Sequence, residues 1–339
     1  MSKKNLSVLS LNKKIISDEK INDIYIKFKK KLNKFKNKSF IVAVSGGPDS
    51  LALTALSRCF EIEKKIKFYY VLVDHRIRKD SSRESLKVKK LLKKNKINLN
   101  ILINKKKIIN NIQSGAREVR YKLLLDFSKK KKSSIIITAH HSDDQIETFL
   151  IRLSRGSGVR GLSSMQTISI LDKKVTLVRP LLDFKKKELQ HVSKKIFGQF
   201  LIDPSNKNQK YLRTKMRNLI SNMNKNGISN DQILKSIQNL SSTNKTLNLY
   251  LNKIFKLNVK KIRKGLHINL KKILLETDEV QIRILSKAIK DFSKSYYPPR
   301  SKKVISLIRN IKTGNQRKFT LSGCIIEKAG TLLVIRKEA

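Results

Sequence analysis

Ser45-Gly46-Gly47-Pro48-Asp49-Ser50 is the stretch that decides the fold class of this 339-residue chain. An apolar run typical of a β-strand precedes it at residues 40–44, and a helical pattern follows at residues 51–56. Glycine lets the backbone approach an anion closely, and the first turn of a helix presents unpaired N–H groups and a positive dipole end. The order strand, glycine turn, helix therefore predicts a phosphate-binding loop. The alternative is an ordinary glycine turn before a helix.

The side chains of this loop suit a nucleotide that carries a metal ion. Ser45 and Ser50 can donate hydroxyl hydrogen bonds to phosphate oxygens. Asp49 would repel a polyphosphate unless a divalent cation lay between them, so we expect Mg²⁺ together with the nucleotide. The loop is not a Walker A motif, because Gly-x-x-x-x-Gly-Lys-Ser/Thr occurs nowhere in the chain.

The chain is strongly basic. Its 77 Lys and Arg against 25 Asp and Glu give a net charge of +52, and its pI is about 10.4. Such a charge predicts a polyanionic partner, most simply nucleic acid. An AT-rich coding sequence, in which Lys, Asn and Ile are abundant together, could account for part of the excess.

Cysteine content and hydropathy narrow the class of protein. The two cysteines, Cys59 and Cys324, form no CxxC pair, which excludes a disulfide framework and a cysteine zinc site. No apolar run approaches the roughly 18 residues of a membrane span. The Lys-rich N-terminus has no apolar signal-peptide core. We expect a cytoplasmic protein that does not contact a membrane.

Apolar strand-like runs alternate with helical stretches over much of the chain. Strands are expected at residues 40–44, 66–73, 97–103, 134–138 and 175–178, and helices at residues 49–60, 81–94, 113–130 and 143–154. This alternation predicts an α/β fold, with a parallel sheet covered by helices on both faces. Such sheets bind ligands at the carboxyl ends of their strands.

Three regions are expected along the chain: a basic lead-in, a nucleotide-binding domain and a smaller α+β domain. Their residues are 1–37, 38–222 and 228–339. The lead-in contains a basic amphipathic helix at residues 21–32, and residues 222–227 are typical of a linker. The last domain is mostly helical up to residue 293 and ends in a β-hairpin, with strands in residues 318–326 and 331–335.

Polar side chains suited to a nucleotide occur at two further places. Asp74 and His75 follow the second predicted strand, where they could contact the nucleoside; a capped strand-end turn is the alternative. Arg117 and Arg120 share a face of the third predicted helix. Paired guanidinium groups suit phosphate oxygens, although an exposed helix surface would look the same.

An acidic cluster begins where the fourth predicted strand ends, in His140-His141-Ser142-Asp143-Asp144-Gln145-Ile146-Glu147-Thr148. His140, Asp143 or Asp144, and Glu147 are three or four residues apart and share a helix face. In so basic a chain we expect the cluster to hold a metal or a cationic substrate. The alternative is a helix N-terminus rich in Asp, which the dipole favours. A metallohydrolase would need a third well-placed His.

Two basic segments follow. Arg155-Gly156-Ser157-Gly158-Val159-Arg160-Gly161 has GxGxxG spacing but follows a helix, which excludes a Rossmann site and leaves a surface loop or a substrate contact. Asp203-Pro204-Ser205-Asn206 predicts a turn and helix cap. Arg213 and Arg217 are four residues apart on the next helix, a geometry that suits polyphosphate or RNA, or simply a capped basic helix.

Together these segments resemble the tRNA(Ile)-lysidine synthetases, members of the PP-loop (N-type) ATP pyrophosphatase superfamily. The glycine loop marks only the superfamily, whereas Asp203-Pro204-Ser205-Asn206 with its two arginines is similar to the lysidine synthetases in particular. The resemblance runs in order through residues 38–220. Its other matching residues are Val73-Asp74-His75, Ala116-Arg117, Arg120-Tyr121, His140, Asp143-Asp144, Glu147-Thr148, Arg155-Gly156, Gly158, Gly161-Leu162 and Arg179-Pro180-Leu181-Leu182.

The resemblance implies an adenine-nucleotide alpha-hydrolase-like fold and a reaction between ATP, free L-lysine and the tRNA(Ile) that carries a CAU anticodon. ATP, with Mg²⁺, would adenylate the 2-carbonyl oxygen of the wobble cytidine and release pyrophosphate. The ε-amine of lysine would then displace AMP and form lysidine. The smaller domain would contact the tRNA, and a homodimer is compatible with this function.

The resemblance also implies which residues hold the nucleotide. The pyrophosphate would be cradled by Ser45, Gly46, Gly47, Pro48 and Ser50. Asp49, together with Asp144, would hold Mg²⁺. Asp74 and His75 would border the adenosine.

Arginines and carboxylates would serve the chemical step. Charge that develops on phosphate would be offset by Arg117, Arg213 and Arg217. The lysine ammonium would be received by Asp143, Asp144 or Glu147. One of these carboxylates would take its proton, since an amine with a pKa near 10.4 is only about 0.04% neutral at pH 7.

Three other classes of protein share part of this pattern. A tRNA thiolation enzyme of the same superfamily also activates a base with ATP, but most need a persulfide cysteine or an iron–sulfur cluster. Cys59, inside a helical pattern, and Cys324, in the hairpin, suit neither. A glutamine-fed amidotransferase needs a glutaminase domain, for which no room remains. A non-catalytic RNA-binding protein would explain the charge but not an acidic cluster at a strand end.

Overall fold

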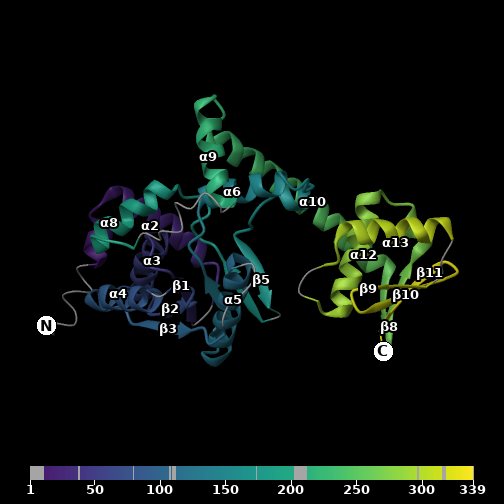
Figure 1. The fold of residues 1–339 in the computed structure, drawn as a ribbon, viewed down its shortest axis with the longest axis horizontal. Coiled ribbons are helices and arrows are strands. Elements are labelled where there is room, and N and C mark those ends of the chain that lie inside the picture. The colour runs from purple at the N-terminus through teal and green to yellow at the C-terminus, as the bar shows by residue number, and fades with distance from the viewer. Residues whose placement is uncertain are drawn as a thin grey trace. The chain divides into compact units, whose positions relative to one another are not determined.

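The computed structural model describes residues 11–36, 39–78, 80–106, 108, 112–172, 174–201, 212–295, 298–314 and 318–338. The chain divides into two compact units, Met1–Ser241 and Ser242–Ala339, drawn as ribbons in Figure 1. The boundary between them along the chain falls within the long helix α10 (Asn230–Asn258), whereas the sequence pattern places it at residues 222–228. Among the described residues, none of the helices combines the length and the hydropathy that a membrane span requires.

The first unit is built on a six-stranded sheet with the order β3-β2-β1-β4-β6-β5. Five strands run parallel, and β5 lies antiparallel along β6. The strands are β1 (Ser39–Val44), β2 (Lys67–Asp74), β3 (Leu99–Ile103), β4 (Ile135–Ile137), β5 (Ile168–Asp172) and β6 (Val175–Val178). The predicted parallel sheet is confirmed, and its phosphate loop follows the central strand β1.

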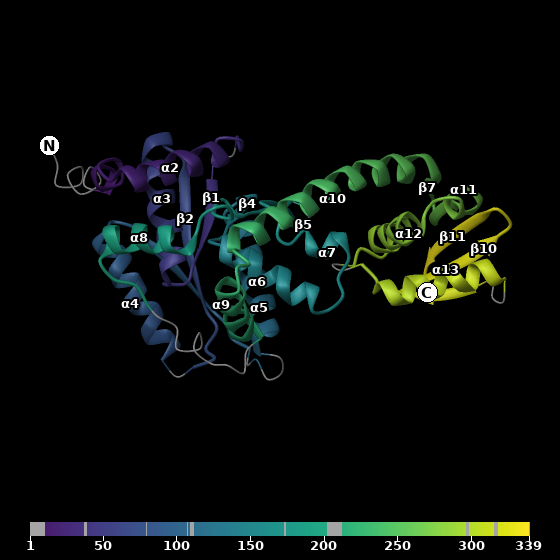
Figure 2. The same cartoon turned by 90° about the horizontal axis from the view of Figure 1, so that it is seen from above.

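Helices cover both faces of this sheet, as Figures 1 and 2 show. Successive side chains of a strand point to opposite faces, so apolar strands need helices on both sides to bury them. In β1, Phe40 and Val42 pack into a core with α2, α3, α4 and α8, whereas Ile41 packs on the opposite side with Leu124 of α5. The helices are α2 (Glu19–Leu32), α3 (Pro48–Lys64), α4 (Ser81–Lys94), α5 (Ile112–Lys130), α6 (Ser142–Leu153), α7 (Val159–Leu162), α8 (Lys186–Phe197) and α9 (Leu212–Lys225). The predicted fold class, with both faces covered, is therefore confirmed.

A separate apolar cluster joins α6 to α9 and to the start of α10. Ile146 and Leu150 of α6 pack against Ile233 and Ile237 of α10, together with Met216 of α9. This small apolar cluster fixes α9 beside α6. It thereby brings the arginines of α9 to the acidic helix.

The second unit is an antiparallel sheet with helices against it. The strand order is β7-β8-β11-β10-β9, and Ile268, Ile326 and Leu333 bury one face of the sheet against apolar residues of α12 and α13. The elements that follow α10 are β7 (Val259–Ile262), β8 (Gly265–Asn269), α11 (Leu270–Leu274), α12 (Asp278–Ser293), α13 (Ser301–Thr313), β9 (Lys318–Leu321), β10 (Cys324–Ala329) and β11 (Leu332–Lys337). The predicted C-terminal α+β character is confirmed.

Two local predictions were wrong, and a third was confirmed. Residues 318–326 are two strands, because Ser322 and Gly323 adopt positive φ angles of 54° and 71° and turn the chain between β9 and β10. The stretch up to residue 293 is mostly helical, as predicted, and the short strands β7 and β8 lie within it. The predicted linker at residues 222–227 is mostly the last turn of α9, which continues to Lys225.

Candidate active site

The glycine loop lies between β1 and α3, as predicted. Gly46 has a φ of +86°, and a Cβ added there would lie 2.5 Å from Cγ2 of Val88. No other residue fits this position, because both the left-handed backbone and the contact with α4 exclude a side chain. Gly47 is the N-cap of α3, so the first turn of the helix opens directly behind the loop.

Ser50 draws the loop together. Its Oγ accepts hydrogen bonds from the backbone N–H groups of Ser45 and Gly46, each at 3.1 Å, and donates to the carbonyl oxygen of Gly47 at 3.0 Å. Two backbone donors thus converge on one point beside the start of a helix. This is the arrangement that binds an anionic oxygen.

Asp74, at the end of β2, organises the turn into α4. Its carboxylate is buried and accepts hydrogen bonds from the backbone N–H of Arg76 at 3.0 Å and from the hydroxyls of Ser81 and Ser82 at 2.8 and 2.6 Å. Burial opposes ionisation, but these donors outweigh it and lower the pKa of Asp74. Its oxygens are thus engaged by the turn that borders the glycine loop.

His75 lies at the same turn with a neutral ring. Burial, and then the positive charge of Arg120, lower the pKa of His75 to about 4, although Asp74 acts in the opposite direction. Its Nδ1 is buried and has no hydrogen-bond partner among the described residues. A neutral imidazole with an open nitrogen can bond a nucleoside, which fits the predicted role.

His141 is the centre of the acidic cluster, and the sequence reasoning missed it as a site residue. Its Nε2 lies 3.5 Å from Oδ2 of Asp49 and 3.6 Å from Oδ2 of Asp144, and its Nδ1 lies 3.8 Å from Oδ1 of Asp143. Burial opposes the charged ring, but the hydrogen bond to Asp49 and the three carboxylates outweigh it and raise the pKa of His141. The available signal was its place at the N-cap of α6, directly before the Asp pair.

Asp49 and Asp144 are the two carboxylates that could hold a metal ion beside the glycine loop. Both present an oxygen to the same imidazole nitrogen, and Oδ1 of Asp49 is buried with no hydrogen-bond partner among the described residues. Within the same residues no group of three or more His, Cys, Asp or Glu side chains is placed to hold a metal ion. Mg²⁺ is usually held by one or two carboxylates together with the phosphates of a substrate, and Asp49 and Asp144 are carboxylates of this kind.

Glu147 interacts with arginines, whereas Asp143 and Asp144 interact with His141. Its buried carboxylate accepts a hydrogen bond from Nε of Arg217 at 2.6 Å, and Nε of Arg213 lies 4.0 Å away. Both predicted arginines of α9 therefore face Glu147. The helix spacing had grouped Glu147 with the aspartates, but the packing of α9 against α6 gives it a different partner.

A cavity of about 300 Å³ adjoins this ion pair. Its polar lining includes Asp143, Glu147, Lys186 and Arg217, together with Asn224 of α9. Carboxylates and cations thus line the same small space. Such a mixture suits a zwitterionic ligand of amino-acid size.

His140 lies at the end of β4 among arginines rather than carboxylates. Its Nδ1 is 2.9 Å from the hydroxyl oxygen of Thr138. Burial, and then the charges of Arg179, Arg117, Arg213 and Arg120, hold the pKa of His140 well below its ordinary value. The predicted grouping of His140 with Asp143 or Asp144 is therefore replaced by His141.

Two further predicted segments are residues 203–206 and the basic glycine loop at residues 155–161. Asp203-Pro204-Ser205-Asn206 falls outside the described residues. The basic glycine loop ends in the short helix α7, and Nη1 of Arg152 donates to the carbonyl oxygens of Gly161 and Ser164 at 2.7 and 3.0 Å. This contact holds the C-terminal end of the loop against α6.

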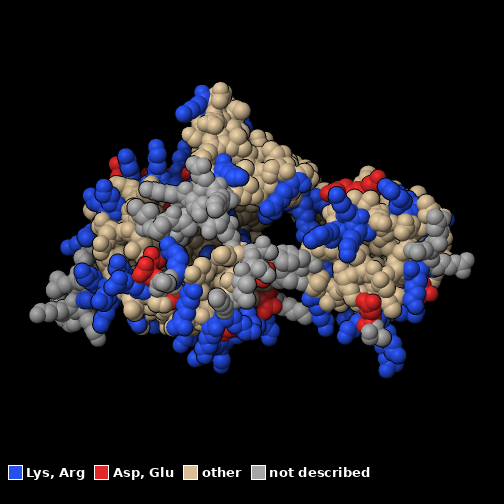
Figure 3. All heavy atoms as spheres, viewed as in Figure 1, with Lys and Arg blue, Asp and Glu red and all other residues tan. Residues whose placement is uncertain are grey.

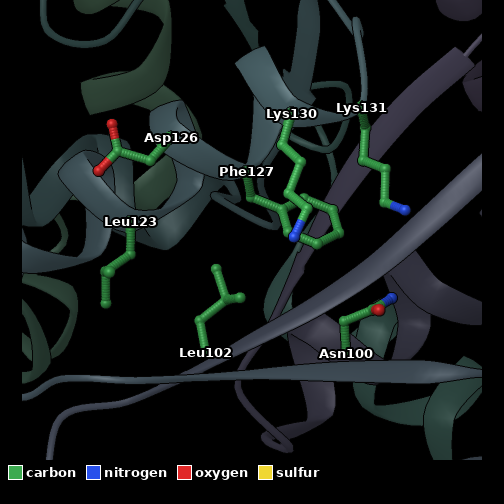
Figure 4. Close-up of a pocket in the computed structure, with 7 residues that line it drawn as sticks. All are labelled: Asn100, Leu102, Leu123, Asp126, Phe127, Lys130 and Lys131. Carbon is green, nitrogen blue, oxygen red and sulfur yellow. The ribbon is translucent and has the colours of Figure 1, made fainter.

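A second groove, of about 370 Å³, lies between β3 and α5 and contains none of the predicted site residues. Figure 4 shows Leu102 and Phe127 near the middle of the view, with Lys130 beside the Phe127 ring and Leu123 and Lys131 farther to either side. The residues that line it are Asn100, Leu102, Leu123, Asp126, Phe127, Lys130 and Lys131.

Comparisons with known proteins show the family of this chain. A family model described as the PP-loop domain matches residues 21–224. The tRNA(Ile)-lysidine synthase of Wolbachia pipientis wMel is 34% identical over 310 residues, which are 90% of this chain and 72% of that protein. The tRNA(Ile)-lysidine synthase of Rhodopseudomonas palustris (strain ATCC BAA-98 / CGA009) is 31% identical and covers 88% of this chain and 90% of its own.

A solved structure supports the fold. The U34-tRNA thiolase NcsA from Methanococcus maripaludis, with its 4Fe-4S cluster, superimposes with a TM-score of 0.56 at 18% identity, over 66% of this chain and 79% of that one. At this identity the likeness concerns the fold alone. The family model spans more than half of the chain and the curated relatives align along most of their length, so this chain belongs to the tRNA(Ile)-lysidine synthase family of PP-loop proteins.

Proposed function

We propose that this protein ligates free L-lysine to the wobble cytidine of the CAU anticodon of tRNA(Ile), with ATP as the source of energy, and so forms lysidine. As a family member the chain is a ligase-type enzyme of tRNA modification with an ATP-binding domain. One observation carries the proposal: Asp49 of the glycine loop and Asp144 of the acidic helix face the same nitrogen of His141. The glycine loop and the acidic helix α6 thus meet at one edge of the sheet.

The glycine loop would receive the pyrophosphate end of ATP. The N–H groups of Ser45 and Gly46 already converge on an oxygen, that of Ser50, and α3 begins immediately behind them. Pro48 starts that helix, and Gly47 leaves its first N–H groups uncovered. Asp74 and His75, at the next strand end, would border the adenosine.

Asp49 and Asp144 would hold Mg²⁺ between them. When bound there, the ion would neutralise charge on the departing pyrophosphate. Arg117, Arg213 and Arg217 would offset charge that develops on the α-phosphate. The 2-carbonyl oxygen of cytidine forms a bond to that phosphorus while the bond to pyrophosphate breaks.

Lysine would bind in the cavity between α6 and α9. Its ammonium group would face Asp143, and its carboxylate would face Lys186 or Arg217 on the opposite lining. Oε2 of Glu147 is buried without a hydrogen-bond partner among the described residues, so this carboxylate has a free acceptor for the ligand.

A carboxylate would then release the nucleophile. Asp143, Asp144 or Glu147 takes the ammonium proton, the ε-nitrogen attacks C2 of the base, and the bond from C2 to the adenylated oxygen breaks to release AMP. The reaction consumes one ATP and one lysine and yields AMP, pyrophosphate and lysidine.

The basic surface would contact the tRNA. Lys and Arg side chains far outnumber Asp and Glu on the face of both units seen in Figure 3, in line with the net charge of +52. The second unit would supply part of this contact. A homodimer and a cytoplasmic location are compatible with the reaction.

Sulfur transfer to a tRNA base is the alternative function, because the U34-tRNA thiolase has a similar fold. Both cysteines are buried, and burial raises the pKa of Cys59 to about 11. A thiol that resists ionisation is a poor sulfur carrier. These observations favour lysine over sulfur as the nucleophile.

The test is incubation of the purified protein with a CAU-anticodon tRNA(Ile) transcript, ATP, Mg²⁺ and radiolabelled lysine. Label in an alkali-stable nucleoside is the expected result. A folded protein that transfers no lysine, or that modifies the tRNA only with a sulfur donor, would contradict the proposal. A protein that binds the tRNA without consuming ATP would instead be a non-catalytic RNA-binding protein.

A further inference from the structure

Arginines gather at the sheet edge next to the glycine loop. Arg117 and Arg120 come from α5, Arg152 from α6 and Arg179 from the end of β6. In the described part of the chain, none of these four pairs with a carboxylate within 4.0 Å, whereas Arg213 of α9 lies at that distance from Glu147. Arg152 is not counted further. We refer to the other three, Arg117, Arg120 and Arg179, together with Arg213 as the arginine cluster.

The members of the cluster act on a common point. All four positive charges lower the pKa of His140, after the larger effect of burial. Crowding by neighbouring protein atoms, and then the charges of Arg117 and Arg213, lower the pKa of Arg120, although part of its side chain stays accessible to solvent. So many like charges around one side chain repel one another unless an anion lies among them.

Arg179 is the innermost member. Its residue is 6% exposed, and its Nη1 donates to the carbonyl oxygen of Gln166 at 2.8 Å and to Oγ of Ser169 at 3.0 Å. Its Nε is buried and finds no partner among the described residues. A guanidinium stays charged when it is buried. Without a carboxylate partner, its burial lowers the stability of the protein unless a ligand supplies the opposite charge.

The outer members remain open to solvent. Arg117, Arg120 and Arg213 are exposed, and the guanidinium carbon of Arg117 lies 4.9 Å from the ring centroid of Tyr121. This cation–π contact with Tyr121 positions the Arg117 guanidinium, a group that can donate two parallel hydrogen bonds to phosphate oxygens. A ligand that enters from solvent would meet these three side chains first and Arg179 last.

We propose that Arg120 and Arg179 of the arginine cluster bind a phosphodiester group of the RNA next to the base that is modified, while the glycine loop binds the nucleotide and Arg117 and Arg213 keep the role at the α-phosphate given above. This inference rests on the function proposed above. The shared chemistry is a pair of phosphate oxygens, for which ATP is the other source. RNA is favoured because the loop of Ser45 and Gly46 already provides a site for the phosphates of the nucleotide, and because the cluster is open to a large ligand.

A chemical double-mutant cycle tests the proposal. CAU-anticodon stem-loop RNAs would carry one neutral methylphosphonate at each phosphate around the target cytidine, and their Kd values would be measured without ATP. The proteins are wild type, Arg120→Gln and the charge-matched control Arg309→Gln, which removes an exposed arginine of α13 in the second unit. Melting curves confirm that each variant is folded.

The expected result is coupling at one linkage. Its methylphosphonate should weaken wild-type binding roughly tenfold, the size of one charge-assisted hydrogen bond. Arg120→Gln should weaken binding of the native RNA by a similar factor, and the two changes together should cost little more than either one. Arg309→Gln should add its own factor independently at the same linkage.

Two results would overturn the proposal. One is that the effects of Arg120→Gln multiply with those of every methylphosphonate. The other is that Arg120→Gln weakens ATP binding, measured without RNA, as much as it weakens RNA binding. Lysine transfer by a wild type that shows no coupling would reject this inference and keep the proposed function, whereas coupling without lysine transfer would do the reverse.

Discussion

Nε of Arg217 donates a hydrogen bond to Oε1 of Glu147 at 2.6 Å and ties α9 to α6. Glu147 is 3% exposed, whereas the Arg217 side chain is 35% exposed. The carboxylate therefore depends on this arginine for its charge balance. The pair also forms one wall of the cavity in which we propose that lysine binds.

Arg217→Gln should lower the free energy of unfolding by about 1–3 kcal/mol, because a buried carboxylate loses its charged partner. The double variant Glu147→Gln, Arg217→Gln should regain part of that loss. Urea denaturation measures both. The control is Lys185→Gln, which breaks the exposed pair between Lys185 and Asp231 and should cost less than about 1 kcal/mol. Equal losses in the two single variants would show that the Glu147 pair is not a buried one.

Asp49→Asn should reduce tRNA-dependent conversion of ATP to AMP and pyrophosphate by at least about 100-fold, since it removes a charge beside the phosphate loop. Binding of tRNA should change by less than about twofold, because Asp49 faces His141 rather than the basic surface. Asp126→Asn, which removes the same charge from the exposed side of α5, is the control and should remain active. Normal ATP turnover by Asp49→Asn would reject the metal role.

The glycine loop and the helices around the sheet could be predicted because each is encoded locally. A strand, two glycines and a helix lie within a few residues of one another, and the positions of α3, α4, α5 and α6 follow from apolar periodicity. The fold class followed from their alternation with strands. Ligands then had to lie at the strand ends.

The pairing of charges could not be predicted, because it depends on packing between distant segments. Asp49 and Asp144 both approach His141 only because β1 and β4 are neighbours in the sheet. Glu147 meets Arg217 only because α9 packs on α6. The strand β7 was missed for another reason: Lys260 and Lys261 lie on an edge strand, where charged residues replace the apolar alternation.

The double variant Cys59→Ser, Cys324→Ser should retain most of its activity with lysine, because an amine nucleophile needs no thiol. Both side chains are buried, so each hydroxyl should cost about 1–3 kcal/mol of stability. Activity is therefore normalised to folded protein from a melting curve. A folded double variant that fails to transfer lysine would point to sulfur chemistry instead.

Lowering the pH from 6.5 to 4 should destabilise the protein partly through His75. The folded pKa of about 4 lies below the ordinary value of 6.5, so the unfolded chain binds more protons in this interval and the free energy of unfolding falls as pH decreases. His75→Gln should flatten this dependence. The imidazole of His75 should remain neutral at pH 5.5 by NMR. A charged ring at that pH would contradict the burial of His75 beside Arg120.

The most direct test of the central claim is the mass of the wobble nucleoside after reaction with lysine, ATP and Mg²⁺. The account predicts that the cytidine gains one lysine and loses one water, with one AMP formed for each nucleoside converted. Asp49→Asn should leave the nucleoside unchanged. An unmodified cytidine with folded wild-type protein, or a mass that fits added sulfur, would contradict the account.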